Sequence, residues 1–297
     1  MKIAFNNVDF SSRSGPNAFG QKLARELMYR GHELTLNSPD VALSFILGHV
    51  PGVRNILRLD GIYFNSEQKW EEMNSPIQKS YELADAVVVQ SEFNRELTSR
   101  YFGERDNVHV IHNGTCLDLI DEVPAKELGK PRDSVWMCAS SWRPHKRLDE
   151  NIRYFQEHAS ETSILIVAGA NAETWAPDLS DDRIILSGDL SWPDMIGFMK
   201  SAGHFLHLAL LDHCPNVVID ARAAGCRIIC SSAGGTKEIA GKDSVIVRDI
   251  EWDYRPFDLY KPRRLDFSQS TDGEKTCDID IKSVCNRYVD VFQGDKS

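Results

Sequence analysis

The sequence of 297 residues contains no apolar run of about 18 residues or more, so it predicts no transmembrane helix. Its first residues also lack the apolar stretch of a secretory signal. Basic residues are too few for a general nucleic-acid-binding surface, because 34 Lys and Arg stand against 44 Asp and Glu, a net charge of −10. We expect a cytoplasmic protein with no nucleic-acid partner and no transmembrane segment, for which peripheral membrane contact stays open.

The sequence also lacks the markers of several kinds of site. Its seven cysteines include no CxxC pair, so neither a disulfide framework nor a zinc site is indicated. Its nine histidines show no metal-ligand spacing. Gly15 and Gly20 are five residues apart, so there is no GxGxxG dinucleotide motif, and residues 241–244 lack the upstream glycine of a Walker sequence. We therefore expect no cofactor.

The first half of the sequence alternates strands with helices. An apolar segment at 2–5 is followed by a glycine-containing loop at 14–20, a helix with one apolar face, and a second strand at 33–36. This βαβ order predicts a parallel sheet with a right-handed crossover. Further strands are expected at 41–47, 55–58, 86–89 and 109–111.

A second series begins after a linker at 123–133 that is rich in charge, Pro and Gly. Strands are expected at 135–139, 164–168, 183–186, 204–211, 227–230 and 245–247, with helices at 148–158, 192–202 and 216–224. Continuous apolar strands of this kind suit a sheet that is covered on both faces. The length of the chain suits two domains.

We therefore predict an α/β fold of two Rossmann-like, doubly wound domains that face each other across a cleft. The N-terminal domain spans 1–125 and is joined by a C-terminal helix within 278–297. The C-terminal domain spans 130–250, and residues 251–277 form a crossover segment.

Two aspartates eight residues apart form the most informative pattern in the sequence. Asp212 falls where the apolar run 204–211 ends, on a loop that leaves a strand, and Asp220 falls within the helix that follows. Ligands of open α/β folds bind at the carboxyl edge of the sheet, where both carboxylates are expected to lie.

This spacing resembles the paired-acid motif of retaining glycosyltransferases that use nucleotide sugars, in which both acids are normally glutamates. Other segments resemble the same group, the GT-B glycosyltransferases of family 4 (glycosyl transferases group 1), over most of the chain and in the family's order. They are a glycine loop and helix at 15–36, the A-D-x-V-x-x-x-S pattern at 84–91, V-I-x-N-G at 110–114, an Arg–Lys diphosphate clamp at 141–146, and a G-G-x-x-E tail within 232–238.

The resemblance implies a binding site for a UDP- or GDP-linked sugar. Arg143 and Lys146 would neutralise the diphosphate, which can replace a metal ion. The helix that begins near Pro215 would add free amides at Asn216 and Val217 and the positive end of its dipole, and proline suits the first helical position. A solvated surface cluster is the alternative for the basic residues at 143, 146 and 147.

The remaining candidates surround the sugar and the ribose. Gly15 lets the backbone approach the donor, although residues 15–17 also fit an ordinary turn. The resemblance implies that Asp212 stabilises the oxocarbenium-like donor sugar and that Asp220 accepts the ribose hydroxyls; an exposed helical aspartate is the alternative for Asp220. His213 contacts the phosphate or sugar, or supports residues that do. Asp60 orients the acceptor hydroxyl or takes its proton, or else caps a turn.

The activity that follows from the resemblance is transfer of a sugar, with retention of configuration, to a sugar or glycan acceptor. Enzymes of this kind are usually held to react on one face through a tight ion pair, so Asp212 is not assigned as a covalent nucleophile. One alternative is a sugar-nucleotide epimerase of the same fold. Another is a non-catalytic nucleotide-sugar-binding protein, which the two aspartates in place of glutamates motivate.

Overall fold

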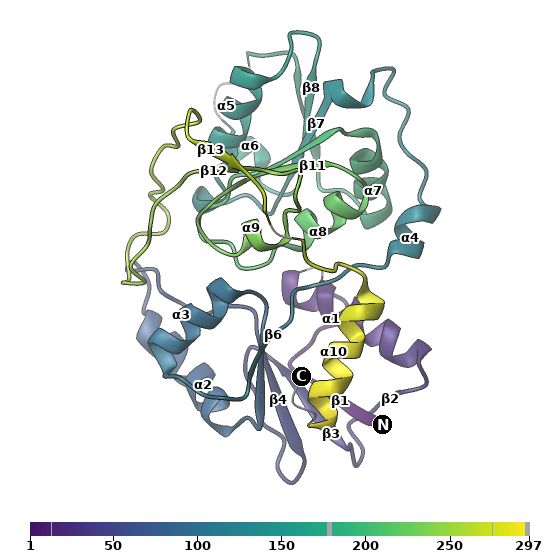
Figure 1. The fold of residues 1–297 in the computed structure, drawn as a ribbon, viewed down its shortest axis with the longest axis vertical. Helices are drawn as coiled ribbons and strands as arrows, with labels where there is room; N and C mark the ends of the chain where they lie inside the picture. Colours follow the sequence, from purple (N-terminus) through teal and green to yellow (C-terminus); the bar gives the residue numbers. More distant parts are fainter. Residues whose placement is uncertain (13, 177–179, 275, 295–297) are drawn as a thin grey trace.

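Two sheets organise the chain, one in each of two stacked α/β domains (Figure 1). The structure is a computed structural model that describes residues 1–12, 14–176, 180–274 and 276–294. Helices pack on both faces of each sheet, so the predicted pair of doubly wound domains is confirmed. No helix in these described ranges is long and apolar enough to cross a membrane.

The first sheet is entirely parallel. Its strands, in spatial order, are β2 (Glu33–Leu34), β1 (Lys2–Asn6), β3 (Val41–Phe45), β4 (Arg54–Leu59), β5 (Ala86–Val89) and β6 (Val108–Val110). Its helices are α1 (Gly15–Tyr29) and α10 (Ile281–Gln293) on one face, and α2 (Trp70–Leu83) and α3 (Glu92–Phe102) on the other. The helix α10, at the end of the chain, thus completes the core of the first domain.

Neither α2 nor α3 is among the helices predicted from the sequence. Pro76 lies inside α2 and interrupts its helical pattern. The buried side of α3 includes Asn94 and Thr98 next to Leu97, so polar residues obscure its apolar period. Both helices are instead stabilised by packing against the first sheet.

The second sheet is parallel except at one edge. Its strands, in spatial order, are β13 (Ser270–Asp272), β12 (Val245–Val247), β11 (Arg227–Ser231), β10 (His204–His207), β7 (Val135–Ala139), β8 (Ile164–Ala168) and β9 (Ile184–Gly188). Only β13 is antiparallel, and it lies within the segment that we expected to cross between the domains. The helices are α5 (Leu148–His158), α6 (Ala172–Trp175), α7 (Trp192–Ser201), α8 (Asn216–Ala223) and α9 (Thr236–Ile239).

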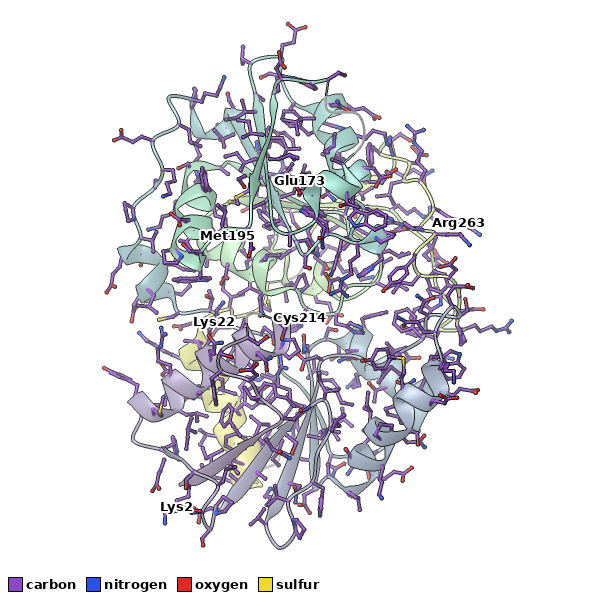
Figure 2. The ribbon with its side chains drawn as sticks, turned by 180° about the vertical axis from the view of Figure 1, so that it is seen from behind. Lys2, Lys22, Glu173, Met195, Cys214 and Arg263 are labelled. Carbon is purple, nitrogen blue, oxygen red and sulfur yellow. The ribbon has the colours of Figure 1, made fainter. Side chains whose placement is uncertain are left out.

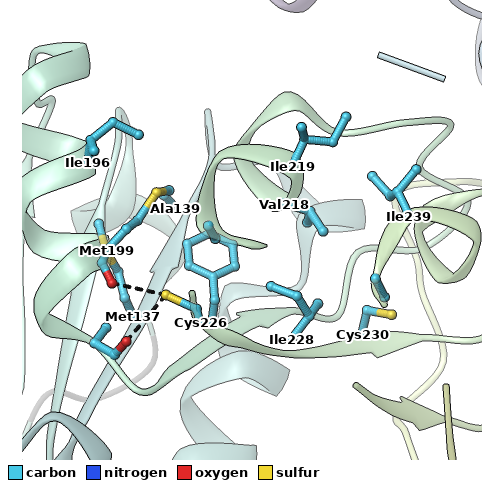
Figure 3. Packing of buried hydrophobic residues seen from close by; sticks show 14 of the residues in the cluster. Met137, Ala139, Ile196, Met199, Val218, Ile219, Cys226, Ile228, Cys230 and Ile239 are labelled. Carbon is cyan, nitrogen blue, oxygen red and sulfur yellow. Dashed lines mark hydrogen bonds between the residues drawn. The ribbon is translucent and has the colours of Figure 1, made fainter. Parts of the chain in front are cut away.

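The helices α7, α8 and α9 cover one face of the second sheet. Ile196, Met199, Val218 and Ile219 from these helices pack on side chains of the central strands (Figure 3). Cys226 belongs to the same cluster, and its thiol donates to the carbonyl oxygen of Met199 at 3.1 Å. The cluster holds α8 against the sheet.

Three predicted strands are shorter than expected, and one of them, β3, ends at Phe45 instead of at residue 47. The strand β2 stops at Leu34, and Leu36 is 75% exposed at the edge of the sheet. The strand β10 ends at His207, although residues 208–211 remain buried, because the chain leaves the sheet and Leu211 adopts a left-handed backbone conformation (φ +55°). A buried loop prolongs the apolar run beyond its strand, and Asp212 lies at the end of this loop.

The chain crosses between the domains twice, once before β7, the first strand of the second sheet, and once after β13, the last. The two crossings meet at Thr115, whose N–H donates to the Ile279 carbonyl at 2.8 Å and whose carbonyl accepts from the Ile281 N–H at 2.9 Å. Thr115 is completely buried. The helix α4 (Leu117–Glu122) follows this junction. The domains are therefore joined by two chain segments that pair with each other at this junction.

Candidate functional site between the two domains

The loops of the candidate site leave the sheets at topological switch points. In the second sheet, β10 and β7 are neighbours, and their connections lead to opposite sides of the sheet. In the first sheet, the same holds for β1 and β3, and the loop after β1 leads to Gly15. Such points are where open α/β sheets bind ligands. The two edges face each other, since Asn216 of the second domain donates from Nδ2 to the Gly15 carbonyl at 2.9 Å.

Asp212 is held by two side chains of its own domain. Its Oδ2 accepts from Lys146 Nζ at 2.5 Å and from His207 Nε2 at 2.9 Å, and its Oδ1 accepts from the His213 N–H at 3.0 Å. Burial raises the pKa of Asp212, but the Lys146 ammonium and the His207 hydrogen bond outweigh this and hold the pKa well below its usual range. Asp212 is therefore a fixed negative charge at neutral pH.

The basic residues of the predicted diphosphate clamp have three different environments. Lys146 is bonded to Asp212. Arg143 is exposed, and its side chain makes no hydrogen bond or ion pair with any described residue, so its guanidinium is available to an anion. Arg147 is buried and forms an ion pair with Asp249 at 2.5 Å, so the alternative of a solvated cluster is wrong for this residue. Its charge is used inside the fold.

The amino terminus of α8 carries the expected free amides. Val218 N–H donates to the Pro215 carbonyl at 3.1 Å, but no described residue accepts from the N–H of Asn216 or Val217. Pro215 is the N-cap rather than the first helical residue, because its backbone is extended (ψ 121°) and the helix begins at Asn216. The side chain of Val217 is half-buried, while Val218 behind it is completely buried. The two amides can bind an anion.

Gly15 opens α1 rather than forming an ordinary turn. It is the first residue of the helix, and Pro16 and Asn17 continue it. A Cβ atom placed on Gly15 would meet no other atom within 4 Å, so open space lies beside this backbone. The contact between the Gly15 carbonyl and Asn216 brings the loop of the first domain to the amides of α8.

Asp220 is nearly buried and already has partners for both oxygens. Its Oδ1 accepts from Lys22 Nζ at 2.7 Å, and its Oδ2 accepts from Trp192 Nε1 at 3.0 Å. Its side chain is 7% exposed, which contradicts the alternative of an exposed helical aspartate. Lys22 belongs to α1 of the first domain, so this ion pair joins the domains (Figure 2, where Lys22 is labelled).

Asp60 lies in a polar network with the buried side chain of Arg58. It accepts hydrogen bonds from Arg58 and Gln90. Burial raises the pKa of Asp60 even against these two donors. Arg58 also donates to Asn113 Oδ1 at 2.7 Å, and Asn113 Nδ2 in turn donates to Asn216 Oδ1 at 3.0 Å. The network therefore connects Asp60 to the start of α8 and does more than cap a turn.

His213 fills the contact between the domains. A Cβ atom on Gly61 would lie 2.6 Å from His213 Nε2, so only glycine permits this approach. The ring of His213 also packs on Phe93 of α3, with centroids 5.4 Å apart. Burial lowers the pKa of His213 to about 4, and its Nδ1 is buried without a partner in the described part of the chain. The imidazole is therefore neutral at neutral pH.

Glu238 forms a second contact between the domains. Its carboxylate accepts from the N–H groups of Glu92 and Phe93, at 2.8 and 3.0 Å, and thereby caps α3 from the other domain. His112 Nε2 lies 3.2 Å from the same carboxylate. Beside these residues is a hollow of about 720 Å³, which both domains line and which includes Phe93, Trp252 and Tyr254. The hollow belongs to the cleft between the domains.

Comparison with known proteins agrees with this architecture. Residues 132–252 match the profile of the family described as glycosyl transferases group 1. Sucrose-phosphate synthase from Thermosynechococcus elongatus is similar to the chain with a TM-score of 0.71 at 13% identity, over 99% of this chain and 98% of that one. Anabaena HepE in complex with UDP has a TM-score of 0.69 at 12% identity, over 99% of this chain and 100% of that one.

The fold is GT-B. AviGT4, a glycosyltransferase involved in avilamycin A biosynthesis, has the same fold at a TM-score of 0.62 and 14% identity, over 98% of this chain and 97% of that one. No curated protein sequence matches the chain at a significant level. The match of residues 132–252 confirms the resemblance to glycosyl transferases group 1 that the sequence motifs carry.

The GT-B cleft contains residues that the sequence pattern did not point to. Lys22 and Trp192 bind Asp220, His207 binds Asp212, and Asn113 connects the two domains. His207 gave a signal, since it is a polar residue within an apolar run. Lys22 gave none, because it lies 198 residues from Asp220 on the polar face of a helix.

Proposed function

We propose that the protein is a glycosyltransferase that moves a sugar from a UDP- or GDP-linked donor to a sugar or glycan acceptor, with retention of anomeric configuration. The observation that supports this most is the position of Asp212. This fixed negative charge, bonded to Lys146, lies at the switch point of the second sheet, next to the free amides of α8. Solved structures of a similar protein fold include complexes with UDP and with UDP-glucose. They support a uridine nucleotide as the first donor to test.

The proposed donor site uses charges that the described residues provide. Arg143 and the amides of Asn216 and Val217 would bind the diphosphate, with Lys146 between the phosphates and Asp212. No metal ion takes part in the proposed reaction, because these groups would neutralise the leaving diphosphate. Gly15 leaves room beside the amides for the donor.

Asp212 would stabilise positive charge as it develops on the sugar. A carboxylate that is already ionised and held by two partners needs little reorganisation during the reaction. Asp60, whose pKa burial raises, is proposed to take the proton of the acceptor hydroxyl. His213, at the contact between Gly61 and Asp212, is proposed to exclude water from this region.

A direct test is to screen UDP- and GDP-sugars by thermal shift and then to assay transfer to a panel of sugar acceptors. We expect stabilisation by one nucleotide class and a product whose anomeric configuration, measured by NMR, matches the donor. Inverted configuration would reject the retaining assignment. Full activity of both Asp212→Ala and Arg143→Ala would reject the assigned site.

The same assay separates the other two activities that the fold allows. Conversion of the donor sugar to an epimer without an acceptor would identify a sugar-nucleotide epimerase. Tight donor binding with neither hydrolysis nor transfer across the acceptor panel would identify a binding protein.

A further inference from the structure

Lys22 forms an ion pair with Asp220, the carboxylate that a donor ribose would need. Its ammonium lies 2.7 Å from Asp220 Oδ1 and 3.1 Å from Thr115 Oγ1, and 6.0 Å from the centre of the Trp192 ring. Trp192 in turn donates to the other oxygen of Asp220. The Lys22 and Asp220 side chains are only 16% and 7% exposed. Asp220 Oδ1 is therefore already bonded and almost shielded from solvent, so a ribose hydroxyl would have to compete with the Lys22 ammonium for it.

We propose that Lys22 competes with the ribose of the donor for Asp220 and so links donor binding to the position of the first domain. This inference rests on the proposed function and on the role that the family resemblance implies for Asp220, which is to accept the ribose hydroxyls. Lys22 is a positioning residue, since it acts through Asp220 rather than on the reacting atoms.

The residues of this contact come from both domains, so the competition links one domain to the other. Lys22 is part of α1 in the first domain, Trp192 and Asp220 are on helices of the second, and Thr115 lies where the two crossings of the chain meet. A motion that separates α1 from α8 would take Lys22 away from Asp220, whereas Trp192 would stay with it. Such a motion would free one oxygen of Asp220 and keep the other bonded.

The competition predicts an unusual sign for the effect of removing the lysine. Without Lys22, the ribose no longer has to displace an ammonium, and Asp220 can accept directly from the hydroxyls. A hydrogen bond to a charged group is worth enough to change affinity by about tenfold. A residue that merely stabilises the fold would weaken binding, or leave it unchanged, when it is replaced.

The test compares UDP with 2′-deoxy-UDP, which lacks one ribose hydroxyl, by isothermal titration calorimetry; GDP and 2′-deoxy-GDP replace them if the donor screen selects guanosine. We expect Lys22→Met to bind UDP about tenfold more tightly than the wild type. The preference for UDP over 2′-deoxy-UDP should also increase. Lys22→Arg keeps the ion pair and should behave as the wild type.

Lys126→Met is the matched control, because Lys126 forms an ion pair with Asp194 at the same distance of 2.7 Å but on the exposed surface. Lys22→Gln serves if Lys22→Met does not fold, as checked by its melting temperature. Weaker or unchanged UDP binding by the folded variant, or an unchanged preference between the two nucleotides, overturns the competition alone. Failure of the wild type to bind any uridine or guanosine nucleotide overturns the proposed function and the competition together.

Discussion

Asp212 and Asp220 are eight residues apart and each binds a lysine, but the two lysines come from different domains. Lys146 and His207 belong to the same domain as Asp212, so the charge and geometry of this acid do not change when the domains move. Lys22 belongs to the other domain, so access to Asp220 depends on how the domains are placed. The difference suggests that catalysis and donor binding can be separated by mutation.

The largest expected effect separates the two acids directly. Asp212→Asn should lower kcat by about 10²–10³-fold, because in the proposed function it removes the fixed charge that stabilises the reacting sugar. Its affinity for UDP should change little. Asp220→Asn should show the opposite pattern, with altered UDP affinity and a smaller effect on kcat. Steady-state kinetics and calorimetry measure both, with the exposed Asp194→Asn as control; an unchanged kcat in Asp212→Asn would remove the distinction.

The next effect uses pH to disturb the contact between the domains. Burial lowers the pKa of His213 to about 4, below its value near 6.5 in the unfolded chain. The neutral ring therefore contributes stability that is fully present above pH 6.5 and is lost as the pH falls toward 4. The contribution is on the order of 3 kcal/mol. Denaturant unfolding between pH 7 and 4.5 should show a shallower loss of stability in His213→Gln than in the wild type.

The exposed His49→Gln is the control for this experiment, and it should retain the wild-type slope. Burial also lowers the pKa of His145, to about 3, so the slope in His213→Gln should be reduced rather than abolished. Identical slopes in the wild type and His213→Gln would show that the ring is not buried against Gly61 in solution.

A smaller effect tests the one clamp residue that has no partner in the described part of the chain. Arg143→Ala should weaken binding of UDP by about tenfold, since it removes one charge-assisted contact to the diphosphate. Uridine, which has no phosphate, should bind equally to both proteins. Equal loss for uridine and UDP would place Arg143 away from the phosphates.

The smallest effect concerns Glu238, which caps α3 across the domain boundary. Glu238→Ala leaves two helix amides without an acceptor and should lower the free energy of unfolding by about 1 kcal/mol. The exposed Glu157→Ala on α5 should change it by only a few tenths. If Glu238→Ala changes the affinity for UDP and leaves kcat unaltered, donor binding depends on this contact as well as on Lys22, because both lie at the domain boundary.

Much of the architecture followed from the sequence because it depends on local patterns. The strands at 135–139 and 164–168 are continuous apolar runs, and the glycine loop before α1 marks its start. The candidate clamp residues and the two acids were also located by local spacing, and their roles stay predictions. What could not be predicted involves partners that are distant in sequence. The residues that bind Asp220 come from α1 and α7, and no pattern within either helix distinguishes Lys22 or Trp192 from an ordinary surface or core residue.

The return of α10 to the first domain has a consequence for how the chain is synthesised. Residues Phe19, Leu23 and Leu27 of α1 share a cluster with Val284, Tyr288 and Phe292 of α10. A ribosome makes the strands of the first domain early but needs roughly 10–30 s more before α10 emerges, at usual elongation rates. The central strands and helices of the second domain are complete before then. The domain that is translated first is thus the last of the two to complete its core, and the apolar surface that α10 covers stays exposed on the nascent chain until α10 has emerged.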